Sequence, residues 1–122
     1  MPRFGRTILV DDYVFDVLMR DLVGHDQQPG AFLVYLHLYR AGERQHWRPV
    51  TRSLRAIAEG TGLSKSAVQM ALRKLRRREL IESTSAHATA AGRHRVLRHW
   101  RQALASTPPR RKTKERVMRA IR

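Results

Sequence analysis

The chain has 122 residues, no cysteine, and a formal net charge of +15 from 25 lysines and arginines against 10 aspartates and glutamates. This length fits one small domain and excludes a substrate domain joined to a cofactor domain. The lack of cysteine excludes disulfides, iron–sulfur clusters and thiolate zinc sites. The longest mostly apolar run is too short to cross a bilayer, and the first residues lack a secretory signal, so we expect a cytoplasmic protein.

The positive charge is concentrated in the second part of the chain. Residues 1–47 contain 5 basic and 6 acidic side chains, whereas residues 48–122 contain 20 basic and 4 acidic ones. Basic side chains near phosphates release condensed counterions, which favours binding to nucleic acids. We therefore predict that the nearly neutral first part of the chain serves packing and that the basic second part contacts a polyanion. A basic surface that merely keeps the protein soluble is the alternative.

The first predicted element is an amphipathic helix. Asp11 or Asp12 caps its start, and Gly24 and His25 interrupt its pattern. Its apolar face, at helical spacing, consists of Val14, Phe15, Leu18 and Leu22. The acids at its start are better explained by their effect on free helix N–H groups than as a catalytic or metal-binding pair.

The second predicted helix is the central one. Pro29 suits its first turn, and residues 31–40 are apolar almost all round, so we expect the most buried element of the domain, ending at Gly42. His37 is expected to be a hydrogen-bonded core histidine rather than a metal ligand. Residues 47–50 include a proline, which limits that segment to an edge strand or an extended connector.

Two further helices with a tight turn between them are predicted from Ser53 onward. The first is short, stops at Gly60, and buries Leu54, Ile57 and Ala58. Gly62 supplies the positive backbone angle of the turn. Ser64 then caps a helix that extends to about Arg78, and its inward face consists of Val68, Ala71, Leu72 and Leu75. Steeply crossing helices need this combination of a small contact residue and a turn glycine.

This segment resembles the winged helix-turn-helix superfamily of bacterial DNA-binding proteins. The resemblance rests on Ala58, Gly62 and Val68, framed by Ile57, Leu63 and Leu75 and followed by the sequence ELIE at 79–82. It covers about residues 11–100. The local sequence GLSKSAVQMALRKL is most similar to the GntR and MarR kinds and to helix-turn-helix domains of phage and plasmid replication proteins. Members often carry threonine or serine where this chain has Ala67.

The resemblance implies a mainly α, α+β fold with a three-helix core, flanking segments and a small β-hairpin wing. It also implies that the helix at 64–78 lies in the major groove of duplex DNA and that the wing at 81–100 contacts the minor groove or the backbone. Bacterial proteins of this type usually bind as dimers. We expect the exposed side of the first helix, or the C-terminal tail, to supply the contact of a homodimer.

The outward stripe of the predicted recognition helix follows from its geometry. With the apolar side chains turned inward, it consists of Lys65, Ser66, Gln69, Met70 and Arg73. Gln69 suits an adenine edge, Arg73 a guanine edge and Met70 a thymine methyl group. Toward the helix end, a basic cluster contains Lys74, Arg76, Arg77 and Arg78. Four cations within five residues repel one another unless an anion lies near, so we expect phosphate contacts, with a solvated helix end as the alternative.

The predicted wing is a β-hairpin. Its strands are Ile81–Ser85 and Arg93–Trp100, joined by a loop of small residues at 86–92, with Val96 and Trp100 on one face and Leu97 on the other. Arg93, His94 and Arg95 directly follow the loop and suit a narrow minor groove. An ordinary exposed hairpin is the alternative.

We divide the chain into a domain at 1–105 and a basic tail at 106–122. The tail starts with a Pro-Pro break and has 7 basic residues and 1 acidic residue. It is expected to contact phosphates, or to form a short helix through Val117 and Ile121 that docks on a partner. Because few residues follow the wing, we expect that no effector-sensing domain is attached.

No catalytic or metal site is predicted. The chain lacks a glycine-rich phosphate loop and a serine or threonine with a recognisable base. His94 and His99 are expected on opposite strand faces, which excludes a metal pair. The sequence therefore predicts a protein that is not an enzyme, needs no cofactor or small-molecule substrate, and is associated with the nucleoid.

The predicted function is sequence-selective binding of duplex DNA, with regulation of transcription. A replication-initiation or partition adaptor of a phage or plasmid is the alternative within DNA binding. An RNA-binding protein is a third hypothesis. It is weakened because the basic part lacks exposed aromatic residues for stacking on single-stranded bases.

Overall fold

The computed structural model describes residues 6–84 and 91–101 of the chain. Its elements in chain order are η2 (Val14–Leu18), η3 (Arg20–His25), α1 (Pro29–Arg44), β1 (Val50–Arg52), α2 (Leu54–Thr61), α3 (Lys65–Arg77), β2 (Ile81–Thr84) and β3 (Gly92–Val96). The fold is mainly α with a small antiparallel sheet, an α+β layout like that of a winged helix, which confirms the predicted fold class. Within the described ranges, no helix has the length and apolarity needed to span a membrane.

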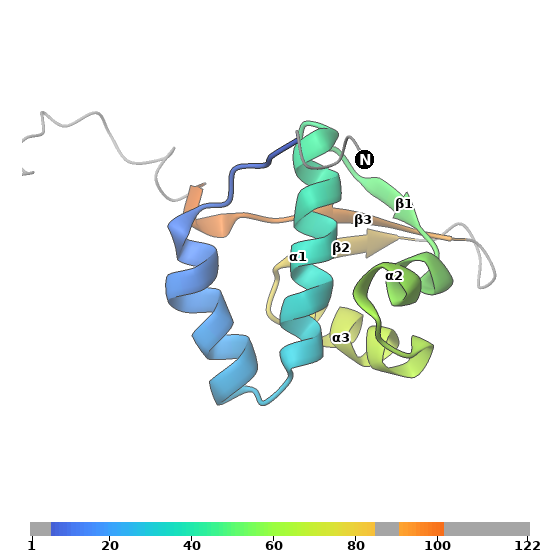
Figure 1. Ribbon diagram of the computed structural model, residues 1–122, viewed down its shortest axis with the longest axis horizontal. Coiled ribbons are helices and arrows are strands. Elements are labelled where there is room, and N and C mark those ends of the chain that lie inside the picture. The colour runs from blue at the N-terminus through green and yellow to red at the C-terminus, as the bar shows by residue number, and fades with distance from the viewer. Residues whose placement is uncertain (1–5, 85–90, 102–122) are drawn as a thin grey trace, which may run out of the picture.

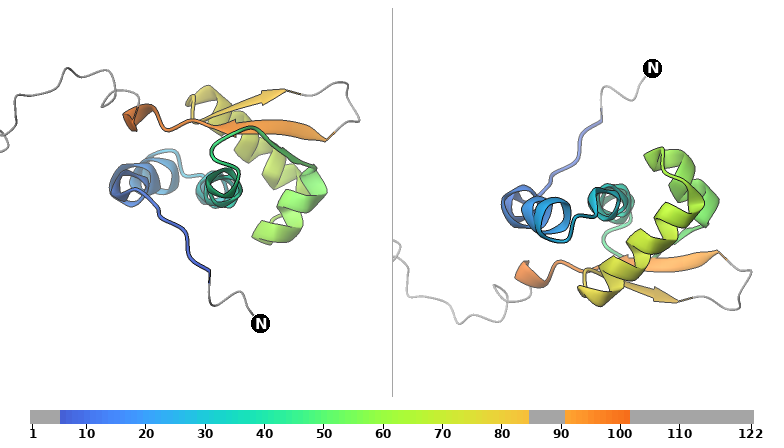
Figure 2. Two further views of the ribbon diagram at one scale, coloured as in Figure 1. Left: turned by 90° about the horizontal axis from the view of Figure 1, so that it is seen from above. Right: turned by 90° about the horizontal axis from the view of Figure 1, so that it is seen from below.

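Helix α1 occupies the centre of the domain (Figure 1). The π-helical stretches η2 and η3, which together we call the N-terminal helix, lie on one side of α1. Helices α2 and α3 lie on the other side, and the sheet crosses behind α1. The views from above and below show the same arrangement (Figure 2).

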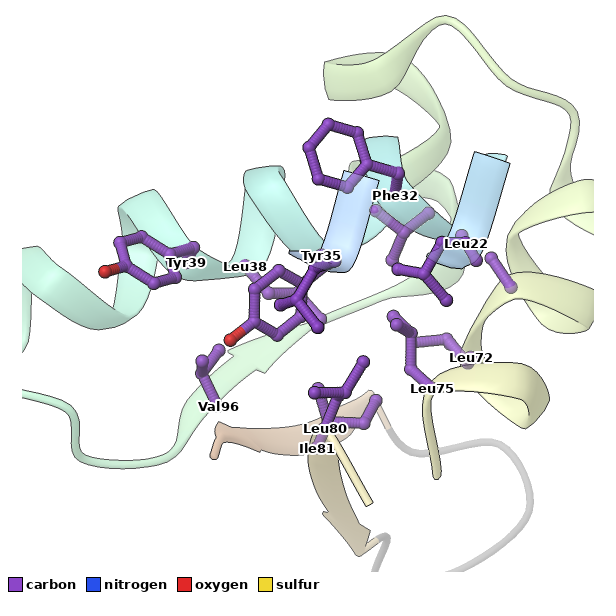
Figure 3. Close-up of a cluster of buried hydrophobic side chains, with 14 of the residues drawn as sticks. Leu22, Phe32, Tyr35, Leu38, Tyr39, Leu72, Leu75, Leu80, Ile81 and Val96 are labelled. Atoms are coloured by element: carbon purple, nitrogen blue, oxygen red, sulfur yellow. The ribbon is translucent and has the colours of Figure 1, made fainter. Parts of the chain in front are cut away.

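One apolar core joins the helices to β2 and β3 (Figure 3). Tyr35 and Leu38 of α1 lie at its centre and are fully buried. Around them pack Leu22 of η3, Leu72 and Leu75 of α3, and Leu80, Ile81 and Val96 of the sheet region. The prediction of a buried central helix is confirmed. However, α1 continues past Gly42 to Arg44, and the amide of Trp47 then donates to the Gly42 carbonyl at 2.7 Å.

The N-terminal helix differs from the predicted α-helix in its hydrogen bonding. Its N–H groups donate five residues back, as the amide of Met19 does to the carbonyl of Val14. Each turn of this helix therefore holds more than the 3.6 residues of an α-helix, so side chains four residues apart in sequence stay on one face. Val14, Leu18 and Leu22 are accordingly buried, but the predicted core residue Phe15 is 44% exposed. The helix extends through Gly24 to His25.

The predicted acidic cap of this helix is not formed. No side chain caps its first turn, and the carboxylate of Asp11 instead accepts hydrogen bonds from Trp100 Nε1 at 2.8 Å and from the guanidinium of Arg101 at 2.7 Å. Trp100 also stacks on Tyr13, with ring centroids 4.5 Å apart. These contacts tie the end of the described chain to its start, because the partners are about 90 residues apart in sequence.

The sheet has the strand order β1-β3-β2, with both pairings antiparallel. The expected edge strand forms as β1, slightly later in the chain than predicted, and pairs with β3. The predicted hairpin forms from β2 and β3, but β3 ends at Val96, so Trp100 lies beyond the strand. The predicted loop residues 86–90 and the tail at 106–122 lie outside the described residues.

Candidate nucleic-acid interface

The turn between α2 and α3 forms as the sequence predicts. Gly62 ends α2 in the left-handed conformation, with φ of 82°, and its amide donates to the Ala58 carbonyl at 2.8 Å. A residue without a side chain adopts this angle with no steric cost. Ser64 then caps α3, because its hydroxyl accepts a hydrogen bond from the Ala67 amide at 3.1 Å. Local sequence therefore fixes both where α3 begins and how it leaves α2.

Helix α3 has one apolar face and one polar, cationic face. Its buried residues are Val68, Ala71, Leu72 and Leu75. The predicted outward residues are all exposed; they are Lys65, Ser66, Gln69, Met70 and Arg73. Two of the basic residues near the helix end, Arg76 and Arg77, are exposed as well. Among them, Met70 is 53% exposed although its side chain is apolar. The structure thus presents these side chains together on one surface, which we call the α3 outer face.

The basic cluster at the end of α3 is partly neutralised within the chain. Arg78 donates to both carboxylate oxygens of Asp26, from Nε at 2.7 Å and from the terminal nitrogen at 2.8 Å. Lys74 Nζ lies 3.9 Å from the same carboxylate and its side chain is only 18% exposed. Arg78 and Lys74 therefore have an anion within the chain, Asp26, and the predicted phosphate contacts of this cluster stay a prediction. Lys74 is therefore the least accessible of the predicted contact residues on α3.

Asp26 was not singled out by the sequence. Its side chain is only 6% exposed, although it lies in the short connection before α1. The hydrogen bonds from Arg78 and His25, together with the charges of Arg78 and Lys74, hold the pKa of Asp26 well below its ordinary value. No local pattern identifies this residue, because Arg78 follows 52 positions later.

Three arginines of α3 remain without an ion-pair partner among the described residues. They are Arg73, Arg76 and Arg77. Arg76 also lines a shallow cleft of about 320 Å³ together with Glu79, Glu82 and His99. Because two carboxylates share this cleft, we expect the positive potential to be strongest at Arg73 and Arg77.

The β3 strand separates the three predicted wing residues. Side chains alternate between the two faces of a strand, so Arg93 and Arg95 are exposed whereas His94 faces inward. Arg95 Nε lies 3.4 Å from a carboxylate oxygen of Glu82 on the neighbouring strand. Arg93 is exposed without an ion pair in the described part of the chain.

The prediction that His94 contacts DNA is wrong. His94 is only 4% exposed, and its Nδ1 lies 2.7 Å from the hydroxyl of Ser83. Burial lowers the pKa of His94, and the charge of Arg76 lowers it further. A neutral, hydrogen-bonded ring inside the wing therefore has a packing role. The sequence contained the signal for this, since a residue between two outward arginines on a strand must point the other way.

The expectation that His37 is a hydrogen-bonded core histidine is wrong for its Nε2 atom. Its ring extends from α1 to Gly60 of α2 and occupies the space that a Cβ atom at position 60 would need. The Nε2 atom is buried without a hydrogen-bond partner among the described residues. Burial lowers the pKa of His37, as do the charges of Arg52 and Arg40. The described residues contain no group of three histidines or carboxylates placed to hold a metal ion.

No protein-family model, curated protein or solved structure matches this chain.

Proposed function

We propose that this protein binds duplex DNA with sequence preference and regulates transcription, with α3 inserted in the major groove. The observation that carries the proposal is the α3 outer face. One side of the helix is held in the core by its apolar residues, and the other side exposes polar and cationic side chains. The major groove of B-form DNA is wide enough to admit an α-helix presented in this way.

The chemistry of the α3 outer face suits recognition of base edges. Arg73 donates two parallel hydrogen bonds to guanine, and Gln69 pairs its amide with adenine. Each such bidentate contact contributes about 1 to 3 kcal/mol of discrimination against the wrong base. Met70 supports an apolar contact with a thymine methyl group, which also accounts for an exposed apolar side chain at the centre of a polar face. Lys65 and Ser66 lie at the start of the same face.

Phosphate contacts come from the arginines that are not engaged elsewhere. Arg76 and Arg77 follow the base-contacting stripe, and Arg93 and Arg95 project from β3. We assign Arg77 and Arg93 the larger contributions, because Arg95 lies near Glu82 and Arg76 borders an acidic cleft. Contacts of this kind fix the register of a protein on DNA but carry no sequence information themselves.

The proposal is tested by selection from randomised duplexes followed by anisotropy titrations. The full-length protein is titrated against an enriched duplex and against a scrambled duplex of equal composition. We expect affinity for the enriched duplex to be higher by at least about a thousandfold, and to fall steeply with salt. Equal affinity for both duplexes would refute sequence-selective regulation.

A matched control separates the α3 outer face from general positive charge. Arg40 is exposed on α1, so Arg40→Ala removes the same charge as Arg73→Ala at another surface. We expect Arg40→Ala to leave the affinity for the enriched duplex within about twofold of the wild type, because a lone surface charge away from the interface contributes little. Structured RNA is added as a competitor at matched salt, and preferential displacement by RNA would favour the RNA-binding alternative.

A further inference from the structure

Trp47 is fixed at the end of α1 by packing against that helix. Its ring meets Tyr39 edge-on, with ring centroids 4.8 Å apart. The ring also lies against Gly42, where an added Cβ atom would be only 3.2 Å from it. The backbone of Trp47 has φ of 67°, in the left-handed region that bulky residues rarely adopt. The packing on α1 therefore holds this ring in place despite an unfavourable backbone angle.

The Trp47 ring carries a positioned cation, Arg98. Arg98 follows β3 in the chain, and its guanidinium carbon lies 3.6 Å from the centroid of the Trp47 ring. An aromatic face attracts a guanidinium without accepting its N–H groups as a carboxylate would. Among the described residues, Arg98 has no ion pair. Arg98 is therefore held in one place and lacks an anion there.

Two further arginines border the same space. Arg95, Arg98 and Arg101 line a hollow of about 180 Å³ beside Trp47. Each of the outer two is held by a carboxylate: Arg95 lies 3.4 Å from Glu82, and Arg101 lies 2.7 Å from Asp11. Three cations and two carboxylates leave one positive charge unbalanced, and it belongs to the central arginine.

The size and the donors of this hollow indicate the chemistry of its ligand. Pockets that enclose whole small molecules measure about 300 to 1,000 Å³, so this hollow fits a single anionic group. The guanidinium fork matches both carboxylates and phosphates. A phosphate group, however, presents acceptor oxygens in several directions, whereas a planar carboxylate suits one fork. Three converging arginines therefore favour a phosphate group.

The hollow lies far from the α3 outer face. The start of α1 is close to both ends of α3: an added Cβ atom at Gly30 would lie 3.6 Å from Leu63, in the turn before α3, and Asp26 pairs with Arg78. Trp47 follows the opposite end of α1 (Figure 1). A helix of 16 residues is about 24 Å long. A ligand in the hollow therefore leaves the α3 outer face accessible.

We propose that the hollow beside Trp47 is a phosphate-binding site separate from the α3 outer face. Arg98 donates to the phosphate group, and Trp47 positions Arg98. The inference goes beyond the proposed function and does not rest on it. The phosphate group belongs either to a small phosphomonoester or to the backbone of a second nucleic-acid segment, and the experiments below distinguish these two sources.

Two-dimensional NMR of the ¹⁵N-labelled full-length protein tests the site directly. The chain has two tryptophans, so the indole N–H signals are few, and Trp100→Phe assigns them. We expect the Trp47 signal to shift saturably with inorganic phosphate at constant ionic strength, because the ligand binds beside that ring. No saturable shift, or an equal response to acetate, overturns the proposal.

Variants of Arg98 test the role of the guanidinium. Arg98→Ala should weaken phosphate binding by at least about tenfold, because it removes charged hydrogen bonds. Arg98→Lys should also lose most of the affinity, since lysine retains the charge but not the fork. Arg44→Ala is the matched control, because Arg44 is exposed in the last turn of α1 and does not line the hollow.

The results of these titrations have definite meanings. Full phosphate affinity in Arg98→Lys overturns the assigned role of the guanidinium. Equal losses in Arg44→Ala and Arg98→Ala show attraction by general positive charge and overturn the site. Melting temperatures equal to that of the wild type establish that each variant remains folded.

DNA titrations identify the source of the phosphate and keep this proposal separate from the proposed function. Arg98→Ala should leave the affinity for a short duplex with a single site unchanged; a loss as large as that of Arg73→Ala overturns the separateness of the hollow. The protein saturated with this duplex is then titrated with a second, unrelated duplex. Capture that requires Arg98 identifies a nucleic-acid backbone. Displacement of inorganic phosphate by adenosine monophosphate, without such capture, identifies a phosphomonoester. Phosphate binding by a protein without sequence preference on DNA overturns only the proposed function.

Discussion

Asp26 and Arg78 form a two-pronged ion pair that joins the connection before α1 to the residue that ends α3. Arg78 Nε and its terminal nitrogen donate to separate carboxylate oxygens at 2.7 and 2.8 Å. Such bidentate pairs have defined geometry as well as strength. The pair therefore restrains the end of the proposed recognition helix against the N-terminal side of the domain.

Removing the carboxylate charge should lower stability. We expect Asp26→Asn to reduce the free energy of unfolding by about 1 to 3 kcal/mol, because the side chain is almost fully buried and Arg78 and Lys74 lose their anion. Urea unfolding measures the change. Glu59→Gln is the control: Glu59 pairs with Arg55 on the surface of α2 at 3.1 Å, and exposed pairs contribute less than about 1 kcal/mol. Equal effects of the two substitutions would contradict the role of Asp26.

The contacts of Asp11 predict a specific loss of stability in acid. The hydrogen bond from Arg101, aided by that from Trp100 and opposed by burial, lowers the pKa of Asp11 from 3.8 to about 2. A carboxyl group with a lowered pKa in the folded state stabilises the protein at pH values above its pKa in the unfolded chain. This stabilisation is lost as the pH falls from about 4 toward 2.

The variant Asp11→Asn isolates that contribution. It lacks the charge at every pH, so the difference in unfolding free energy between wild type and variant should shrink by about 1 kcal/mol between about pH 5 and pH 3. Urea unfolding at a series of pH values measures it. The other carboxylates titrate in both proteins and cancel. A difference that stays constant with pH would show that Asp11 has an ordinary pKa.

Arg73 and Arg77 should affect DNA binding in different ways. We expect Arg73→Ala to lose about 1 to 3 kcal/mol on the preferred duplex and to relax the preference at one base pair. Arg77→Ala should weaken binding to all duplexes alike and reduce the slope of log affinity against log salt by about 1. Titrations over a salt series on single-base variants of the duplex test both. Equal losses on every sequence for Arg73→Ala would show that the proposed base contact is misplaced.

His94 should matter for stability and not for DNA contact. We expect His94→Ala to lower the free energy of unfolding by about 2 kcal/mol, because it removes a buried ring and leaves Ser83 without its partner. Thermal unfolding measures this. The neighbouring Arg93→Ala should leave the melting temperature unchanged and weaken DNA binding through a lost phosphate contact. The reverse pattern would mean that His94 turns outward.

The predictions that succeeded concern features encoded within a few residues of one another. The cap at Ser64, the turn at Gly62 and the two faces of α3 all follow from patterns no longer than the helix itself. Hydrogen bonds from side chain to backbone three residues away, and helical periodicity, are set by local sequence. The surface proposed to contact DNA was therefore predictable, apart from the contacts of Asp26 with Lys74 and Arg78.

The expectations for the basic cluster and for the N-terminal cap depended on long-range partners. Lys74 and Arg78 were assigned to phosphates because the sequence does not show that Asp26 folds against them. The same holds for Asp11, expected as a helix cap, which instead accepts hydrogen bonds from Trp100 and Arg101. In each case the competing partner is 48 or more residues away, so only the packed chain brings the groups into contact.

The sequence by itself determined that a capped, amphipathic α3 follows a glycine turn and that its outer face is cationic, because local hydrogen bonds and apolar periodicity act within single elements. Tertiary structure alone decided which cations remain available and which are held by Asp26, and that β1 pairs with β3. It also decided that Arg98 lies over the ring of Trp47, since contacts between distant residues depend on which elements meet across the whole fold.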